Sequence, residues 1–282
     1  RPAAEREPLM RAQTLKAFGL SHDPFTKEIA DDDLWIPPSK KEVIESIVET
    51  VTARQHLVVV GEPGAGKTAV LRAVRHSLPE TRYRLTYCHN ATLGRRDFYR
   101  QLCVAIGLSP KASAAAIFNA LNDYVLELAA ERNQHPVFIL DECHLMKDEM
   151  LDHLHILQNY AWDSRAILSL VLVGLPELHE RLQRRRHRSL MSRIHRRYVI
   201  EPLEPRDTTE YLRHRLALAG CDRELFPSDA VAVLHEKTGG LMRDLDRISA
   251  LALDIAAKRR AKVVHKDIGL GAISVDMNGG LE

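Results

Sequence analysis

The strongest chemical signal in the sequence is the stretch Gly61-Glu62-Pro63-Gly64-Ala65-Gly66-Lys67-Thr68. It follows the apolar run Leu57–Val60 and precedes a helical pattern, so the order is strand, glycine-rich loop, helix. Glycines let the backbone turn so that successive N–H groups face anionic oxygens, and the helix start adds the positive end of its dipole. We expect Gly61–Ala69 to bind the phosphates of ATP. Lys67 would reach the β- and γ-phosphates, and the Thr68 hydroxyl would bind Mg²⁺.

A second stretch, Val137-Phe138-Ile139-Leu140-Asp141-Glu142, ends in two carboxylates. Its four apolar residues predict a central parallel strand buried on both faces. Ligands bind at the carboxyl edge of such sheets, where this strand would place both acids. We expect Asp141 to hold Mg²⁺ through water and Glu142 to orient and deprotonate the attacking water. The two stretches together predict a nucleotide-hydrolysing site.

Composition agrees with a soluble protein of one large domain or two smaller ones. The chain has 282 residues, of which 45% are hydrophobic and 28% charged. Its four cysteines show no C-x-x-C spacing, which suits a reducing cytosol. The longest apolar stretch, residues 166–175, is too short to cross a bilayer, and no secretory signal is visible. We therefore expect a cytoplasmic protein without a membrane partner.

The order of elements predicts an α/β fold: a P-loop domain with a five-stranded parallel sheet, then a small C-terminal helical lid. Strands are expected at 57–60, 83–88, 137–140, 168–173 and 198–200, with helices between them. After Glu201-Pro202-Leu203-Glu204-Pro205 the pattern is helical only. The expected division is an N-terminal arm (1–24), the nucleotide-binding domain (25–203), the lid (204–270) and a C-terminal tail (271–282).

These pieces in this order resemble the AAA+ ATPases over residues 25–270. Gly61–Thr68 is similar to their Walker A motif and Val137–Glu142 to their Walker B motif. The resemblance implies ATP and Mg²⁺ as cofactors and ATP hydrolysis as the activity. It also implies that Asn90, just past the second strand, restrains the catalytic glutamate, and that Arg243 of Gly239–Arg243 returns to the nucleotide as a sensor-2 residue.

The same resemblance implies an arginine finger before the fifth strand. Arg193 of Ser192-Arg193-Ile194 would reach the γ-phosphate held by a neighbouring subunit, with Arg196 and Arg197 as competing candidates. One departure lies at the end of the fourth strand. The family has a polar side chain there, whereas this chain reads Gly174-Leu175-Pro176. The departure bears on the rate of hydrolysis more than on nucleotide binding.

Within AAA+, the layout is similar to the ExeA-like and transposition-regulator ATPases of the TnsC, MuB and IstB types. The cues are Phe18-Gly19-Leu20, Asp23-Pro24-Phe25, Asp97-Phe98-Tyr99, Asp141–Leu145 and Val173–Leu178. The first function implied is regulation of DNA transposition. ATP would join subunits into a ring or helical filament on double-stranded DNA, without sequence preference. The assembly would recruit a transposase, with a target-selection protein as a further expected partner. Arg95, Arg96 and Lys111 are the expected contacts to DNA phosphates.

Two other functions remain open. One is an ExeA-like protein-remodelling ATPase that couples ATP to assembly of a secretion or envelope complex. The other is a nucleotide-operated signalling switch with no nucleic-acid partner. The net charge is only +2, but basic residues cluster at Arg184-Arg185-Arg186-His187-Arg188. That cluster fits DNA binding and a subunit interface equally well.

Overall fold

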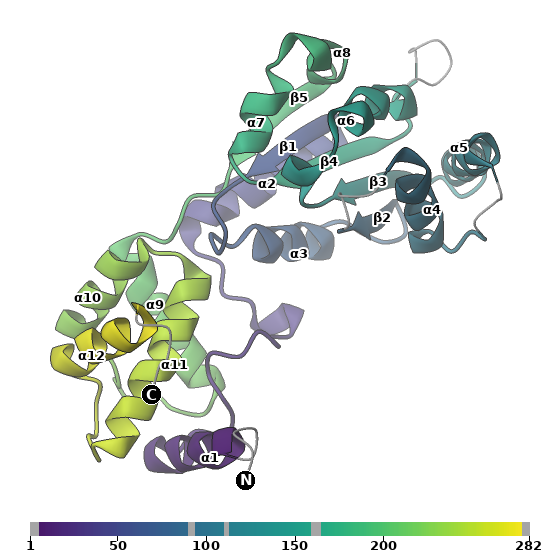
Figure 1. The fold of residues 1–282 in the computed structure, drawn as a ribbon. Coiled ribbons are helices and arrows are strands. Elements are labelled where there is room, and N and C mark those ends of the chain that lie inside the picture. Colours follow the sequence, from purple (N-terminus) through teal and green to yellow (C-terminus); the bar gives the residue numbers. More distant parts are fainter. Residues whose placement is uncertain (1–5, 90–93, 110–112, 159–164, 278–282) are drawn as a thin grey trace. The chain divides into compact units, whose positions relative to one another are not determined.

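The structure is a computed structural model that describes residues 6–89, 94–109, 113–158 and 165–277. The chain divides into two compact units. The first, called the sheet unit below, comprises residues 38–62 and 67–200. The second, called the helical unit, comprises residues 1–37, 63–66 and 201–282. Figure 1 shows strands and helices in the former and helices in the latter.

The sheet unit is built on five parallel strands in the order β2-β3-β4-β1-β5 (Figure 1). They are β1 (His56–Val60), β2 (Tyr83–Cys88), β3 (His135–Leu140), β4 (Ser169–Gly174) and β5 (Ile194–Val199). Every residue of β3 and β4 is buried, as expected of central parallel strands covered on both faces. The predicted α/β class with a five-stranded parallel sheet is confirmed.

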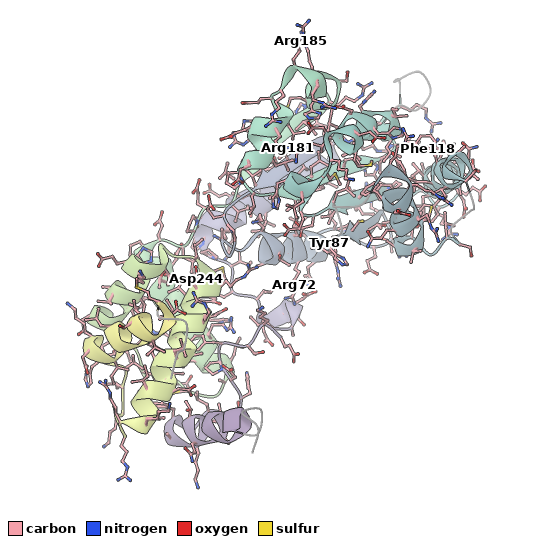
Figure 2. All side chains as sticks on the ribbon, in the orientation of Figure 1. Arg72, Tyr87, Phe118, Arg181, Arg185 and Asp244 are labelled. Atoms are coloured by element: carbon pink, nitrogen blue, oxygen red, sulfur yellow. The ribbon has the colours of Figure 1, made fainter. Side chains whose placement is uncertain are left out.

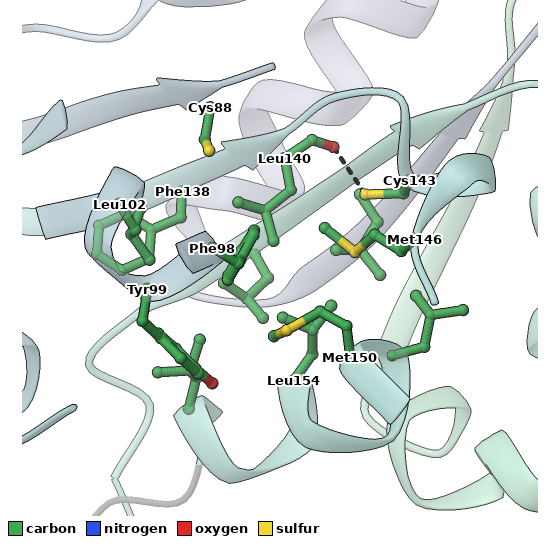
Figure 3. Close-up of a cluster of buried hydrophobic side chains, with 14 of the residues drawn as sticks. Cys88, Phe98, Tyr99, Leu102, Phe138, Leu140, Cys143, Met146, Met150 and Leu154 are labelled. Carbon is green, nitrogen blue, oxygen red and sulfur yellow. Dashed lines mark hydrogen bonds between the residues drawn. The ribbon is translucent and has the colours of Figure 1, made fainter. Parts of the chain in front are cut away.

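Helices cover both faces of this sheet. A single apolar core joins alternate side chains of β1, β3 and β4 to one group of helices, and Figure 3 shows part of it. These helices are α4 (Arg95–Ala105), α5 (Ala114–Ala130), α6 (Asp148–Leu154), α7 (Glu177–Leu182) and α8 (Arg188–Met191). A second group of elements packs separately from these helices: α2 (Pro38–Thr52) contacts α3 (Lys67–Ser77), β1 and β5. Because strand side chains alternate, Leu57 and Val59 face away from the first core.

The fifth strand differs from its expected position. The sequence predicted residues 198–200, but β5 begins at Ile194 and ends at Val199. It is an edge strand, and His195, Arg196 and Arg197 are exposed. Charged residues are common on exposed sheet edges and hide the apolar pattern that marks a buried strand. The shift places Arg196 and Arg197 on the strand itself, and Arg193 directly before it.

The helical unit has one apolar core made by its helices and by residues from the amino-terminal segment. Its helices are α1 (Arg6–Phe18), α9 (Pro205–Leu218), α10 (Ser228–Thr238), α11 (Met242–Lys258) and α12 (Lys266–Met277), with the short 3₁₀ turn η2 (Asp31–Asp33). The side chains that make up this core include Leu212, Leu234, Leu245 and Ala252. Among the residues that the structure describes, no helix combines the length and apolar character needed to cross a bilayer.

Residues 1–24 were expected to form an arm, and the described part of this segment contains a helix that belongs to the helical unit. Arg6–Phe18 is the helix α1, which contacts α11. The Thr14 hydroxyl donates to Asp254 Oδ1 over 2.5 Å, and Phe18 is buried in the core of the helical unit. The apolar residues of this segment show little helical periodicity, so the sequence gave little sign of this helix.

The expected tail at 271–282 contains the end of a helix in its described part. Helix α12 continues to Met277, and both Ala272 and Ile273 are buried in the helical unit. Helix α12 packs against α10 and α11. Gly269 and Gly271 interrupt its apolar pattern, and the sequence therefore gave no core signal for residues 272–282.

A buried arginine fixes the loop that follows α1. Arg215 on α9 is 2% exposed. Its Nε donates to Pro24 O and its Nη2 to Thr26 O, each over 2.6 Å, and its Nη1 donates to the Tyr211 hydroxyl over 2.7 Å. Asp246 lies 3.3 Å from Nη1, and burial raises the pKa of this carboxyl to about 6, against the opposing effect of Arg215. These bonds hold the backbone at Pro24 and Thr26 against α9.

Candidate nucleotide-binding site

The loop between β1 and α3 requires its glycines. Gly64 and Gly66 have φ angles of +86° and +98°, in the region that only glycine adopts without strain. A Cβ at Gly61 would come within 2.6 Å of Ile200 O, so this position also excludes a side chain. The backbone therefore has the tight turn predicted for a phosphate-binding loop.

Lys67 is the first residue of α3 and its side chain folds back over the loop. Its Nζ donates to Gly61 O over 2.7 Å and to Glu62 O over 3.0 Å. Its ammonium group thus lies inside the curve of the loop, together with the positive end of the α3 dipole. Thr68 is the next residue and is exposed, as a ligand-binding hydroxyl must be. Lys67 and Thr68 thus lie next to each other where the loop meets α3, and their roles toward phosphate and Mg²⁺ stay predictions.

Residues 63–66 cluster with the helical unit, where the beginning of α11 contacts them. Met242 N donates to Gly64 O over 2.9 Å. A Cβ at Gly64 would lie 3.0 Å from Arg243 Cβ. Arg243, the predicted sensor-2 residue, is thus held beside the loop backbone and has an exposed side chain.

Asp141 follows β3 directly, with a residue exposure of 7%. Its Oδ1 accepts from Glu142 N over 2.8 Å, and its Oδ2 accepts from the Tyr87 hydroxyl over 2.5 Å. Each carboxylate oxygen keeps a further lone pair. Oxygen donors of this kind are what Mg²⁺ takes in proteins, so Asp141 with the Thr68 hydroxyl fits the predicted ion.

Tyr87 was missed by sequence reasoning. It lies on β2, and the β2–β3 register places it opposite Ile139, two residues before Asp141. Burial and the neighbouring Asp141 raise the pKa of its hydroxyl, so it stays a hydrogen-bond donor at physiological pH. Tyr87 and Thr68 line the same hollow, of about 390 Å³, between α3 and β2. No spacing in the sequence shows this contact, because it depends on strand pairing.

Glu142 has a left-handed backbone, with φ +56° and ψ +30°, which is uncommon outside glycine. Its side chain is 49% exposed, and its Oε2 lies 3.5 Å from His144 Nε2. The following residues form the 3₁₀ turn η3 (Cys143–Leu145). A carboxylate that is half open to solvent at this edge of the sheet can take a proton from a water molecule.

Arg193 lies at the opposite end of the strands from the phosphate-binding loop. The amino end of β5 pairs with the amino end of β1, at His56 and Ile194, whereas the loop follows the carboxyl end of β1. At about 3.3 Å per residue this separates Arg193 from Gly61 by roughly 15–20 Å. Its Nη1 donates to Ser189 O over 3.3 Å. Arg193 is therefore too far away to act on the loop of its own chain.

The remaining predicted residues are placed in part. Asn90 and Lys111 lie outside the described residues. Arg95 and Arg96 begin α4 and are exposed, and Arg95 Nη1 lies 4.0 Å from Glu149 Oε1. In the basic cluster, His187 is buried between Asp148 and Asp152, whereas Arg185 projects from the surface (Figure 2).

Comparisons with known proteins agree with this architecture. Residues 50–182 match the family described as AAA domain. General secretion pathway protein A of Aeromonas hydrophila is 33% identical over 263 residues, which cover 92% of this chain and 48% of the relative. This chain thus spans about half the length of that protein.

Two solved structures share the fold at low sequence identity. A Drosophila ORC structure bound to DNA gives a TM-score of 0.70 at 20% identity, covering 98% of this chain and 68% of the other. The Aeropyrum pernix ORC2 protein, in ADPNP–ADP complexes, gives 0.66 at 16% identity, covering 92% and 72%. Residues 50–182 are thus similar to an AAA domain, and the chain shares its fold with these two structures.

Proposed function

We propose that this chain binds ATP with Mg²⁺ and hydrolyses it to ADP and phosphate. The observation that carries the proposal is the pairing of two features at one edge of one parallel sheet. The first is a glycine loop with an inward-folded lysine after β1, and the second is a pair of carboxylates directly after β3. ATP turnover by the purified protein, with release of phosphate measured against a Glu142→Gln control, tests it.

Each residue has a task in this reaction. The loop N–H groups and the Lys67 ammonium bind the β- and γ-phosphates and stabilise the charge that spreads over the transferred group. Thr68 and Asp141 would hold Mg²⁺, which neutralises phosphate charge when bound. The Tyr87 hydroxyl orients Asp141 through its 2.5 Å hydrogen bond. Glu142 orients the attacking water and accepts its proton.

The position of Arg193 supports assembly of several copies. Since Arg193 is too far from its own loop, a role at a γ-phosphate requires the site of a neighbouring chain. We therefore propose that ATP joins copies into a ring or helical filament. Arg193→Ala should bind ATP normally but lose ATP-dependent assembly and turnover. Sedimentation with a slowly hydrolysed ATP analogue measures the assembly, and Arg196→Ala and Arg197→Ala are the matched comparisons.

The cellular role that sequence similarity favours is assembly of a secretion or envelope complex. Its support is the 33% identity to a general secretion pathway protein over 92% of this chain. In this role the ATP-driven change would act on a protein partner. A pull-down with the nucleotide-trapped Glu142→Gln protein from its native envelope fraction would reveal such a partner.

A second candidate is the regulation of DNA transposition, in which the assembly marks double-stranded DNA for a transposase. Arg95 and Arg96 are the observation that favours it, since both are exposed at the beginning of α4. Binding to random duplex that requires ATP and weakens steeply with salt would support this role. Failure to bind duplex under any nucleotide condition would leave the secretion role or the signalling switch.

A further inference from the structure

The carboxylate of Glu142 has one neighbour that the proposed mechanism does not use. His144 lies two residues further on, in the turn η3, and its ring is 12% exposed. The left-handed backbone of Glu142 and the bond from Leu145 N to Glu142 O, at 2.9 Å, fold this turn back on itself. As a result, the His144 ring and the Glu142 side chain lie on the same side, with Nε2 3.5 Å from Oε2.

The other ring nitrogen of His144 fixes which atom carries the proton. Leu175 N, just past the end of β4, donates to His144 Nδ1 over 3.3 Å. A backbone N–H can only donate, so Nδ1 is the acceptor, and in the neutral ring Nε2 must carry the hydrogen. The Nε2–H group then faces the carboxylate of Glu142. The ring therefore links the end of β4 to the predicted general base.

The chain makes room for this ring at Gly174. A Cβ there would lie 3.2 Å from His144 N and 3.3 Å from His144 Nδ1, closer than most real contacts. Leu178 Cδ2 would lie at 3.0 Å, so any side chain at the end of β4 would press on Leu178 and on the histidine. The sequence has no such side chain at this position, and the imidazole occupies the space instead.

An arginine holds the same turn from α7. Arg181 Nη1 donates to His144 O over 2.5 Å, and its Nη2 donates to Met146 O over 2.6 Å. Arg181 Nη2 also contacts Asp148 Oδ1 at 2.6 Å. The backbone of His144 is thus fixed independently of its ring, which leaves the ring's two nitrogens for Leu175 and Glu142.

We propose that His144 is a positioning residue for Glu142. Its ring, locked by the Leu175 N–H, donates from Nε2 to the carboxylate and holds it where it accepts a proton from water. This inference rests on the proposed ATP hydrolysis. In this proposal, His144 lies in the turn after β3 and provides the contact between the end of β4 and the general base.

Three substitutions of His144 distinguish the roles of its two ring nitrogens. Glutamine places its amide nitrogen near the position of Nε2, whereas asparagine places its amide near Nδ1 only. His144→Leu and His144→Asn should lower kcat for ATP about tenfold to a hundredfold, with KM for ATP unchanged within about twofold. His144→Gln should restore most of kcat. His179→Gln, on α7, is a matched control that should match the wild type.

Two further measurements distinguish this role from a structural one. In a Glu142→Gln background, His144→Leu should cause no further loss, since the residue acts through Glu142. Nitrogen NMR of the imidazoles, with His144 assigned by its loss in His144→Gln, should show the Nε2–H form. Equal kcat in all His144 variants, or an Nδ1–H ring, would overturn the inference. A wild-type protein that turned over no ATP would instead overturn the proposed function, and the NMR result would still decide the ring's role.

Discussion

The helical unit and the sheet unit both bury charged side chains, but the two units differ in how much of the hydrogen-bonding capacity of these side chains is used within the protein. In the helical unit, Arg215 donates to two carbonyl oxygens and a hydroxyl and faces Asp246. In the sheet unit, Asp141 is also buried, yet each of its carboxylate oxygens accepts one hydrogen bond, and the next residue, Glu142, is open to solvent. The first cluster uses its bonding capacity to hold the chain together. The second keeps capacity for a ligand.

This difference gives a practical rule for telling a structural cluster of buried charges from one that can bind a ligand. A charge whose bonds are all made within the protein stabilises the fold, because removing it leaves its partners unsatisfied. A carboxylate with spare lone pairs at the carboxyl edge of a parallel sheet is equipped to bind or to accept protons. The two clusters should therefore respond differently to mutation.

The largest effect is expected at Glu142. Glu142→Gln keeps the size of the side chain but removes the base, so ATP turnover should fall by about 10²–10⁴-fold. ATP affinity and the free energy of unfolding should stay within error of the wild type. Phosphate release and calorimetric ATP binding measure both. A variant that hydrolysed ATP at the normal rate would show that Glu142 is not the base.

Lys67→Ala should come next, with ATP affinity lowered about a hundredfold or more because the charged donor to the phosphates is lost. Lys41→Ala, an exposed lysine on α2, is the control and should bind as the wild type does. Isothermal titration with Mg-ATP measures the difference. If the Lys67→Ala variant kept its affinity for ATP, this loop would not be the phosphate-binding element.

Arg215→Ala should affect stability rather than chemistry. It leaves the buried Asp246 unpaired and the carbonyls of Pro24 and Thr26 without donors, at a cost of about 3 kcal/mol in the free energy of unfolding. Arg215→Lys should also destabilise, since an ammonium cannot reproduce the fork of three donor nitrogens. Urea unfolding of both variants tests this. A variant as stable as the wild type would contradict the structural role.

The smallest expected effect is an opposite response of the two units to pH. Burial lowers the pKa of His135 in β3 to about 4, so its contribution to stability is complete above about pH 6.5 and is lost as pH falls toward 4. Asp246, with its pKa raised to about 6, binds its proton more tightly in the folded state. Its contribution therefore declines as pH rises from about 4 to 6.

Each of these pH effects is worth about 2–3 kcal/mol. Denaturant unfolding at several pH values should show that His135→Gln flattens the fall in stability on the acid side. Asp246→Asn should instead remove the decline between about pH 4 and 6. If both substitutions changed the pH profile in the same direction, the assignment of one titrating group to each unit would be wrong.

Much of the candidate nucleotide site could be predicted because its residues lie in two short, contiguous stretches of the sequence. Gly61–Thr68 and Val137–Glu142 each contain a buried strand, a turn and functional side chains in fixed order, so local sequence carries the geometry. The fold class followed from the same alternation of strands and helices. The errors fell where local pattern is weak: the basic edge strand β5, the polar helix α1, and the glycine-containing end of α12.

By itself, the sequence determined the loop that turns only with glycines, the buried strands and the acids that end β3. Only the tertiary structure decided that the Tyr87 hydroxyl donates to Asp141, that His144 lies between Leu175 and Glu142, and that Arg193 lies at the opposite end of the strands from its own loop. The physical reason is that these contacts depend on the register of strands and on the space at Gly174. Both the strand register and the space at Gly174 depend on residues that are far apart in the chain, so no short stretch of sequence predicts them.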